Sequence, residues 1–274
     1  MSDITVINDS EQSSLVTNGL AKNGELYLKA DGSTDAGAIV VYDSGSWRTF
    51  ANEASPSFSN QYSVDFDGTD DYIDLGTSSD LAPANITLMC WFKASGTIGT
   101  YNFLMYQSNT MFGAFRLTYR ISNKFECMIS GPWGYSNIES SSTYTLTDWH
   151  HVAMTYDQSY LRLYVDGVEA NSVAQSNALS YNGSNTWIGK GNAAQNAEGV
   201  MDECAVFNTA LSSSDISSIY NSGVPADISS YSPVGWYRMG DNDSGTGTTI
   251  TDQGSGGNDG TLVNGPTFST DVPS

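Results

Sequence analysis

Basic residues are scarce in this chain of 274 residues, and that scarcity narrows the range of its partners. Ten Lys and Arg stand against thirty Asp and Glu, so the formal net charge at pH 7 is −20. A field of that sign repels phosphate backbones and anionic lipid surfaces. We therefore expect neither nucleic acid binding nor membrane insertion, whereas the excess of carboxylates attracts divalent cations.

Cysteines and long apolar runs are scarce as well. Cys90, Cys127 and Cys204 stand singly, without a CxxC pair, which argues against a disulfide framework or a zinc ribbon. We expect three free, buried thiols in a chain made in a reducing cytoplasm. The longest apolar stretch, residues 38–42, is too short to cross a bilayer, and no secretory signal is visible.

Aromatic residues and glycine are abundant, with 16 Tyr, 10 Phe, 6 Trp and 27 Gly. This composition favours strands and turns over helices. Short apolar or alternating runs recur between turn residues, as at 86–92, 151–156 and 160–165, and Asp166-Gly167 is a tight hairpin signal. Many short strands at regular spacing predict an all-β fold, an antiparallel sandwich of the jelly-roll type.

One short helix is expected on this all-β body. Ser212 and Asp215 have the spacing of a capping box. Ile216 and Ile219 then form an apolar face, and Gly223 is expected to end the helix.

Several ordered motifs resemble laminin-G-like, concanavalin A-like jelly-roll domains. They are residues 62–73, 149–157, 163–167, 187–189 and 201–203, followed by a run at 208–223 that is similar to the terminal helix of that family. The resemblance implies a lectin-like jelly roll over residues 61–223 and is nearly silent about the ligand.

The two ends of the chain suggest further segments. Residues 28–54 are similar to segments in structural proteins of marine bacteriophages, which implies an N-terminal attachment segment over residues 1–60 with Trp47, Arg48 and Phe50 as attachment residues. Residues 224–274 resemble the segment that normally precedes such a jelly roll. We expect their strands either to complete the sandwich or to pack on a neighbouring subunit.

These resemblances imply a phage virion structural protein, a head decoration or fibre or a tail-associated fibre. Its partners would be other virion proteins of capsid or tail and a host-surface polysaccharide, and its expected state is a homotrimer. It would be made in the host cytoplasm and located in the virion. The alternative is a free-standing bacterial carbohydrate-binding lectin module.

A glycoside hydrolase is the third functional hypothesis, and the positions of the acidic residues argue against it. Hydrolysis needs two carboxyl groups that face each other across the scissile bond. Asp202 and Glu203 are neighbours on a predicted strand, so they should point to opposite faces. We therefore expect no enzyme activity. His150 and His151 should also diverge, with His151 as a core or edge residue that fixes a hydrogen bond.

A structural calcium site is predicted at one acidic turn. Asp67, Asp70 and Asp71 cluster there, and the family resemblance implies a further acid near Asp202. Hard oxygen ligands of this kind suit Ca²⁺. The alternative is a solvated turn whose aspartates support its backbone geometry.

Aromatic side chains in predicted loops are the candidates for glycan binding. Trp133 and Tyr135 lie in a turn-rich segment, and Tyr101 flanks another possible loop. Exposed rings with nearby amides stack on sugar rings. The alternative for Trp133 is that its indole packs back over the sheet edge.

Overall fold

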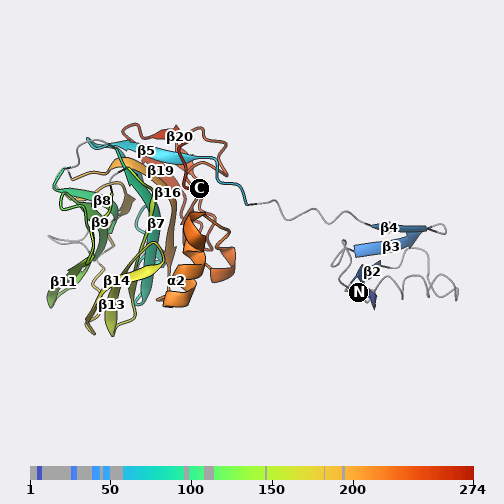
Figure 1. The fold of residues 1–274 in the computed structure, drawn as a ribbon, viewed down its shortest axis with the longest axis horizontal. Coiled ribbons are helices and arrows are strands. Elements are labelled where there is room, and N and C mark those ends of the chain that lie inside the picture. The colour runs from blue at the N-terminus through green and yellow to red at the C-terminus, as the bar shows by residue number, and fades with distance from the viewer. Residues whose placement is uncertain are drawn as a thin grey trace. The chain divides into compact units, whose positions relative to one another are not determined.

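The computed structural model describes two compact units, Met1–Phe58 and Ser59–Ser274. In the first unit it describes the backbone of four strands (Figure 1). Elsewhere it describes residues 58–95, 99–107, 114–145, 147–181, 183–192 and 195–274. Within these described parts, no helix has the length and apolar character needed to span a membrane.

The N-terminal unit contains a four-stranded sheet in the order β1-β2-β3-β4. The strands are β1 (Thr5–Ile7), β2 (Leu26–Lys29), β3 (Ile39–Asp43) and β4 (Ser46–Thr49). β1 runs parallel to β2, and the other pairs are antiparallel. The proposed attachment residues Trp47 and Arg48 lie on β4, whose side chains are not described, and Phe50 lies outside the described residues.

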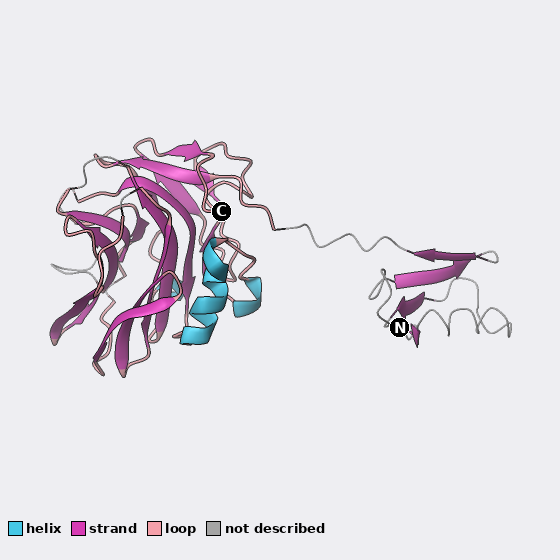
Figure 2. Cartoon of the chain, in the orientation of Figure 1, coloured by secondary structure: helices cyan, strands magenta, loops and turns pink. Residues whose placement is uncertain are grey.

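The second unit is a sandwich of two antiparallel sheets, which confirms the predicted fold class (Figure 2). Sheet 1 has the order β14-β13-β12-β7-β16-β5-β20, and β17 pairs with β16 beside this row. Its strands are β14 (Val168–Ala174), β13 (Tyr160–Val165), β12 (His150–Tyr156), β7 (Ile86–Ala94), β16 (Glu198–Phe207), β5 (Ser63–Asp67), β20 (Thr267–Ser269) and β17 (Gly235–Tyr237).

Sheet 2 has the order β11-β10-β9-β8-β15-β6-β19-β18. Its strands are β11 (Gly134–Glu139), β10 (Phe125–Gly131), β9 (Phe115–Arg120), β8 (Tyr101–Gln107), β15 (Thr186–Ile188), β6 (Tyr72–Asp74), β19 (Gly260–Val263) and β18 (Thr249–Ile250). The chain thus brings β15, from late in the sequence, between β8 and β6.

The core lies between the two sheets and is built from alternate strand residues. Leu88, Cys90 and Phe92 of β7 are buried in it, together with Val152 and Met154 of β12. Burying a side chain such as Leu88 contributes about 1.5–3 kcal/mol. All three cysteines are free and buried, as the sequence predicts.

A short helix, α2 (Ser213–Tyr220), covers part of sheet 1 (Figure 1). The predicted capping box is present, because Ser212 and Asp215 exchange hydrogen bonds across the first turn. Tyr220 stacks on Trp91 of β7 at 5.8 Å between ring centroids. The helix ends earlier than predicted, because Asn221 takes the left-handed conformation at φ 47°. Three single turns of 3₁₀ helix, η1 (Ser79–Leu81), η2 (Asn221–Gly223) and η3 (Ser229–Tyr231), complete the described helical parts.

The C-terminal strands pair within this chain. β17 pairs with β16, β20 pairs with β5, and β19 joins β18 to β6. Residues 224–274 therefore supply strands to the edges of both sheets, which covers backbone groups that an open edge would expose.

Candidate functional site

Five aromatic rings form a continuous row on the outer face of sheet 2. Ile73 and Ile188 are fully buried in the core, so their strand neighbours Tyr72 and Trp187 point to the opposite face. We call the set Tyr101, Phe103, Tyr106, Trp187 and Tyr72 the aromatic row. Its successive ring centroids lie 6.0, 5.3, 6.0 and 6.1 Å apart, separations typical of favourable aromatic pairs.

The ends of the aromatic row are more accessible than its middle. Phe103 and Tyr106 are each 1% exposed, whereas Tyr101, Trp187 and Tyr72 are half-buried. The backbone at Gly191 lies directly on the ring of Phe103, since an added Cβ there would come within 2.5 Å of a ring atom. The aromatic row is therefore accessible to a ligand at its two ends.

Cations lie over both ends of the aromatic row. Arg116 and Arg120 lie 5.4 and 4.7 Å from the centroid of the Tyr101 ring, and both form ion pairs with the buried Glu126. At the other end, the Lys190 ammonium lies 3.6 Å from the Tyr72 centroid and 4.7 Å from that of Trp187. Such cation–π contacts hold each charge against an aromatic face.

A depression of about 200 Å³ opens at the Tyr101 end, and we call it the rim depression. It is lined by Gly68, Gly99, Thr100, Tyr101, Gln195, Asn196 and Glu198. Tyr101 belongs to both the depression and the aromatic row. One half-exposed ring, two amides, a hydroxyl and a carboxylate thus converge on one concave surface, a combination suited to a ligand rich in hydroxyl groups.

The predicted acidic turn borders the rim depression through Gly68. Asp67, Asp70 and Asp71 can each place a carboxylate oxygen within 4.8 Å of the others. The Asp71 carboxylate accepts from the backbone N–H of Asp67 at 3.1 Å. Burial raises the pKa of Asp71, and the charges of Asp67 and Asp70 add to the effect. A hard cation would relieve this repulsion, so the three residues fit Ca²⁺, which stays a prediction.

Asp202, the predicted fourth ligand, lies elsewhere. Glu198 of β16 is the residue that pairs with Asp67, so Asp202 is four residues, about 13 Å, further along the strand. Its carboxylate accepts from the Asn60 side chain at 2.8 Å. The acid on β16 that adjoins the turn is Glu198, whose side chain packs against Gly68.

Asp202 and Glu203 share one face of β16, contrary to the sequence prediction. Asp202 pairs with Trp91 and Ala205 with Met89, so β16 has one residue more than β7 across this stretch. Glu203 takes a φ of 46° within this bulge. A β-bulge interrupts the alternation of side chains, which is why the prediction of opposite faces is wrong.

The two acids are held in a buried network. Glu203 accepts from the Trp236 indole N–H at 2.5 Å and from Arg238 Nε at 3.1 Å. Arg238 also donates to the Ser59 carbonyl and to Asp241. Burial raises the pKa of Glu203 to about 7, against the lowering effect of Arg238. The network therefore ties β17 and the start of the sandwich unit to β16.

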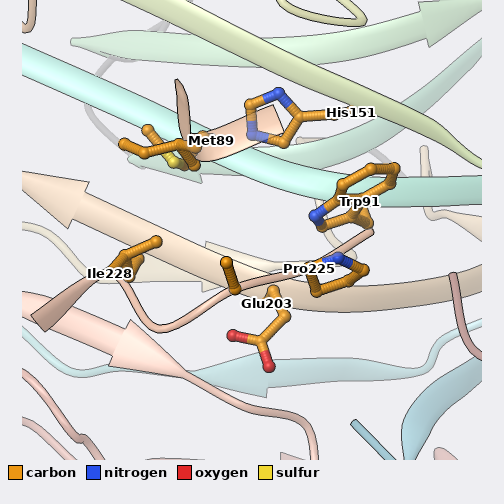
Figure 3. Close-up of a pocket in the computed structure, with 8 residues that line it drawn as sticks. Met89, Trp91, His151, Glu203, Pro225 and Ile228 are labelled. Carbon is orange, nitrogen blue, oxygen red and sulfur yellow. The ribbon is translucent and has the colours of Figure 1, made fainter. Parts of the chain in front are cut away.

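The pocket beside Glu203 is too small for a sugar (Figure 3). It holds about 10 Å³, room for one water, and is lined by Met89, Trp91, His151, Glu203, Ile219, Pro225, Ala226 and Ile228. Glu203 is thus covered by α2 and the segment that follows it, and both acids are buried. A substrate cannot reach the pair in this conformation.

His151 is a core residue but does not fix the hydrogen bond expected of it. It is 1% exposed, and neither ring nitrogen has a partner among the described residues. Its ring lies against Trp91 at 5.2 Å between centroids. Burial lowers its pKa to about 4, so the ring is neutral at pH 7.

The structure does not gather the three predicted glycan residues. Trp133 is half-buried against the core and donates its indole N–H to the Ala178 carbonyl at 2.9 Å. Tyr135 is 53% exposed and pairs with Ser130 at one end of β10. Tyr101 lies near the other end of the same sheet, about 20 Å away by strand register. Of the three, Tyr101 alone lines the rim depression.

Sequence reasoning missed Phe103, Trp187 and Tyr72 as site residues, and it missed Lys190. Tyr72 and Trp187 alternate with core residues on their strands, a signal visible in the sequence, whereas a register shift at Phe103–Met105 breaks the alternation along β8. What the sequence does not show is that β15 lies between β8 and β6, with Trp187 paired to both Tyr106 and Asp74. The row exists because of that long-range pairing.

The fold is shared with solved structures of low sequence identity. A candidate carbohydrate-binding protein from Bacteroides ovatus superposes with a TM-score of 0.61 at 18% identity, over 92% of this chain and 71% of that one. The CBM40 domain of the Ruminococcus gnavus IT-sialidase gives a TM-score of 0.50 at 14% identity, over 59% of this chain and 99% of that one. At these identities the likeness shows the fold alone.

Comparison by sequence identifies the family of this chain but no individual relative. No curated protein matches the chain. The family profile of the concanavalin A-like lectin/glucanases superfamily matches residues 67–217, more than half of the chain. The matched range contains the acidic turn, the aromatic row and the rim depression. The chain belongs to the concanavalin A-like lectin/glucanases superfamily.

Proposed function

We propose that this protein is a carbohydrate-binding module that holds a glycan at the rim depression. The observation that carries the proposal is the convergence of Tyr101 with Gln195, Asn196 and Glu198 on one open concave surface. The lectin-like family and the Bacteroides ovatus relative, a candidate carbohydrate-binding protein, support it.

The chemistry of the depression matches what a sugar ring offers. The C–H groups of a pyranose ring pack against an aromatic ring, while its hydroxyls need hydrogen-bonding partners. The Gln195 amide and the Glu198 carboxylate supply donors and acceptors close to Tyr101. A volume of about 200 Å³ is smaller than a typical drug-sized pocket, so the depression suits one sugar unit of a longer glycan.

A glycan array followed by calorimetric titration tests this proposal. We expect the full chain to bind at least one oligosaccharide, and Tyr101→Ala and Gln195→Ala each to weaken that binding about tenfold or more. Tyr160→Ala is the matched control, because Tyr160 is also partly exposed, at 43%, and also lies against an arginine. Equal losses in the control, or no binding to any glycan, would overturn the proposal.

Display of this module on a phage particle is a second proposal. It is supported by the separate compact unit that residues 1–58 form, with a sheet of its own. Deleting residues 1–58, the first compact unit, should abolish incorporation into particles while the sandwich keeps its melting temperature, and light scattering on the full chain should find a homotrimer. Incorporation of the shortened chain would contradict the attachment role.

A further inference from the structure

Lys190 differs from most of the other cations of the sandwich unit. Lys93, Arg116, Arg120, Arg162 and Arg238 each pair with at least one carboxylate. Lys190 has no such pair within the described residues, although the chain carries a net charge of −20. Its ammonium lies instead over the rings of Tyr72 and Trp187.

A second unused donor lies in the same cluster. The Trp187 indole N–H is buried and has no acceptor among the described residues. A buried donor without a partner is costly, so native proteins rarely leave one. Lys190 adds ammonium donors within 4.7 Å of the same ring. Because the indole N–H is buried, the Lys190 ammonium is the donor of this cluster that a ligand can reach.

The acid beside this cluster is already engaged. Asp74 pairs with Trp187 in the strand register. Its carboxylate accepts from the Asn185 side chain at 2.8 and 2.9 Å and from the Gly76 backbone N–H at 2.9 Å. Asp74 is therefore held by its own neighbours and leaves the Lys190 charge without a counterion.

We propose that Tyr72, Trp187 and Lys190 form a subsite for an anionic sugar. The sugar packs beside the half-exposed rings, and its carboxylate or sulfate accepts from the Lys190 ammonium. This subsite rests on the proposed carbohydrate binding and names its ligand class. A local cation on a strongly acidic chain gives selectivity, since anionic sugars are repelled elsewhere on the surface.

Paired neutral and acidic glycans test the subsite on the full chain. The probes are galacturonate oligomers and sulfated galacto-oligomers, each compared with the neutral galacto-oligomer of equal length. We expect the acidic probes to bind at least tenfold more tightly in 20 mM salt, with most of that preference lost at 500 mM because salt screens the charge. If both acidic probes bind more tightly than the neutral oligomer, the subsite recognises negative charge in general. If one of them does, that probe identifies the preferred group as carboxylate or sulfate.

Variants separate this subsite from the rim depression. Lys190→Met keeps the apolar stem and should remove the preference for acidic probes while neutral binding persists. Lys190→Arg should retain the preference. Lys124→Met is the matched control, since Lys124 also has no carboxylate partner among the described residues but lies outside the aromatic row, and it should change nothing. Melting temperatures confirm that each variant folds.

The outcomes distinguish the two proposals. Equal affinity for neutral and acidic probes, or an unchanged preference in Lys190→Met, overturns the anionic subsite and leaves carbohydrate binding in place. No binding of either series overturns both.

Discussion

Glu203 shows how one backbone angle changes what a residue can do. On a regular strand it would face away from Asp202, but its left-handed φ within the bulge places both acids on one face of β16. There Trp236 and Arg238 hold its carboxylate. The residue pair that most resembles a hydrolytic centre in the sequence is therefore a buried junction between strands.

This burial predicts a pH dependence of stability. The pKa of Glu203 rises from 4.5 to about 7 on folding, so the folded state binds the proton more tightly than the unfolded state. The stabilisation is fully present below pH 4.5 and is lost as the pH rises through 7. We expect the free energy of unfolding of the wild type, relative to Glu203→Gln, to fall by roughly 3 kcal/mol across that range.

Denaturant unfolding at several pH values measures this difference. Subtracting the variant removes the opposite effect of His151, whose lowered pKa makes its contribution present above pH 6.5 and lost as the pH falls through 4. Asp202 has a pKa raised by burial and by the charge of Glu203, so it acts in the same direction as Glu203. A difference between wild type and variant that does not change with pH would contradict the buried, shifted carboxyl.

At the scale of elements, the close packing of β16 against β7 requires a glycine on β16. Gly199 of β16 has a φ of 138°, and an added Cβ would lie 2.3 Å from the Lys93 carbonyl oxygen on β7. Backbone on a central strand cannot move aside. The conformation and the close approach therefore both require glycine.

Gly199→Ala should lower the free energy of unfolding by about 3 kcal/mol or more, because the strain at positive φ and the overpacking against β7 add to each other. Gly247→Ala is the control: its φ is also positive, at 86°, but nothing lies within 4 Å of the added atom. That control should cost about 1–2 kcal/mol. Thermal or urea unfolding measures both, and equal losses would show that the contact with β7 is not what matters.

The acidic turn between β5 and β6 carries the calcium prediction. If the turn binds Ca²⁺, EGTA should lower the melting temperature by several degrees, and added Ca²⁺ should restore it. Asp70→Asn should abolish that response, while Asp80→Asn, an exposed acid of η1, should leave it intact. A melting temperature that EGTA leaves unchanged would contradict calcium binding and indicate a solvated acidic turn without an ion.

Local signals in the sequence predict most of these elements but not their neighbours. The capping box at Ser212, the hairpin at Asp166-Gly167 and the apolar run of β7 depend on nearby residues, so they can be recognised from the sequence. The bulge at Glu203 and the position of β15 between β8 and β6 depend on pairing with distant strands. Site residues such as Trp187 were missed for that reason.

At the scale of the whole molecule, the chain forms two compact units. The sandwich unit carries the family match, the aromatic row and the rim depression, and its C-terminal strands pair at its own edges. The fold was predictable because its motifs lie in family order. The ligand was not, because a jelly roll hosts many unrelated sites and the site here joins residues that are far apart in the sequence.

The most direct test of the account is to map a bound glycan by amide chemical shifts on the labelled full chain. The ligand is the tightest binder from the array, titrated to saturation. We predict that the largest shifts fall on residues 68, 99–101, 187–191 and 195–198, which line the rim depression and the exposed far end of the aromatic row. Shifts confined to α2 and β14, on the other side of the sandwich, would contradict it.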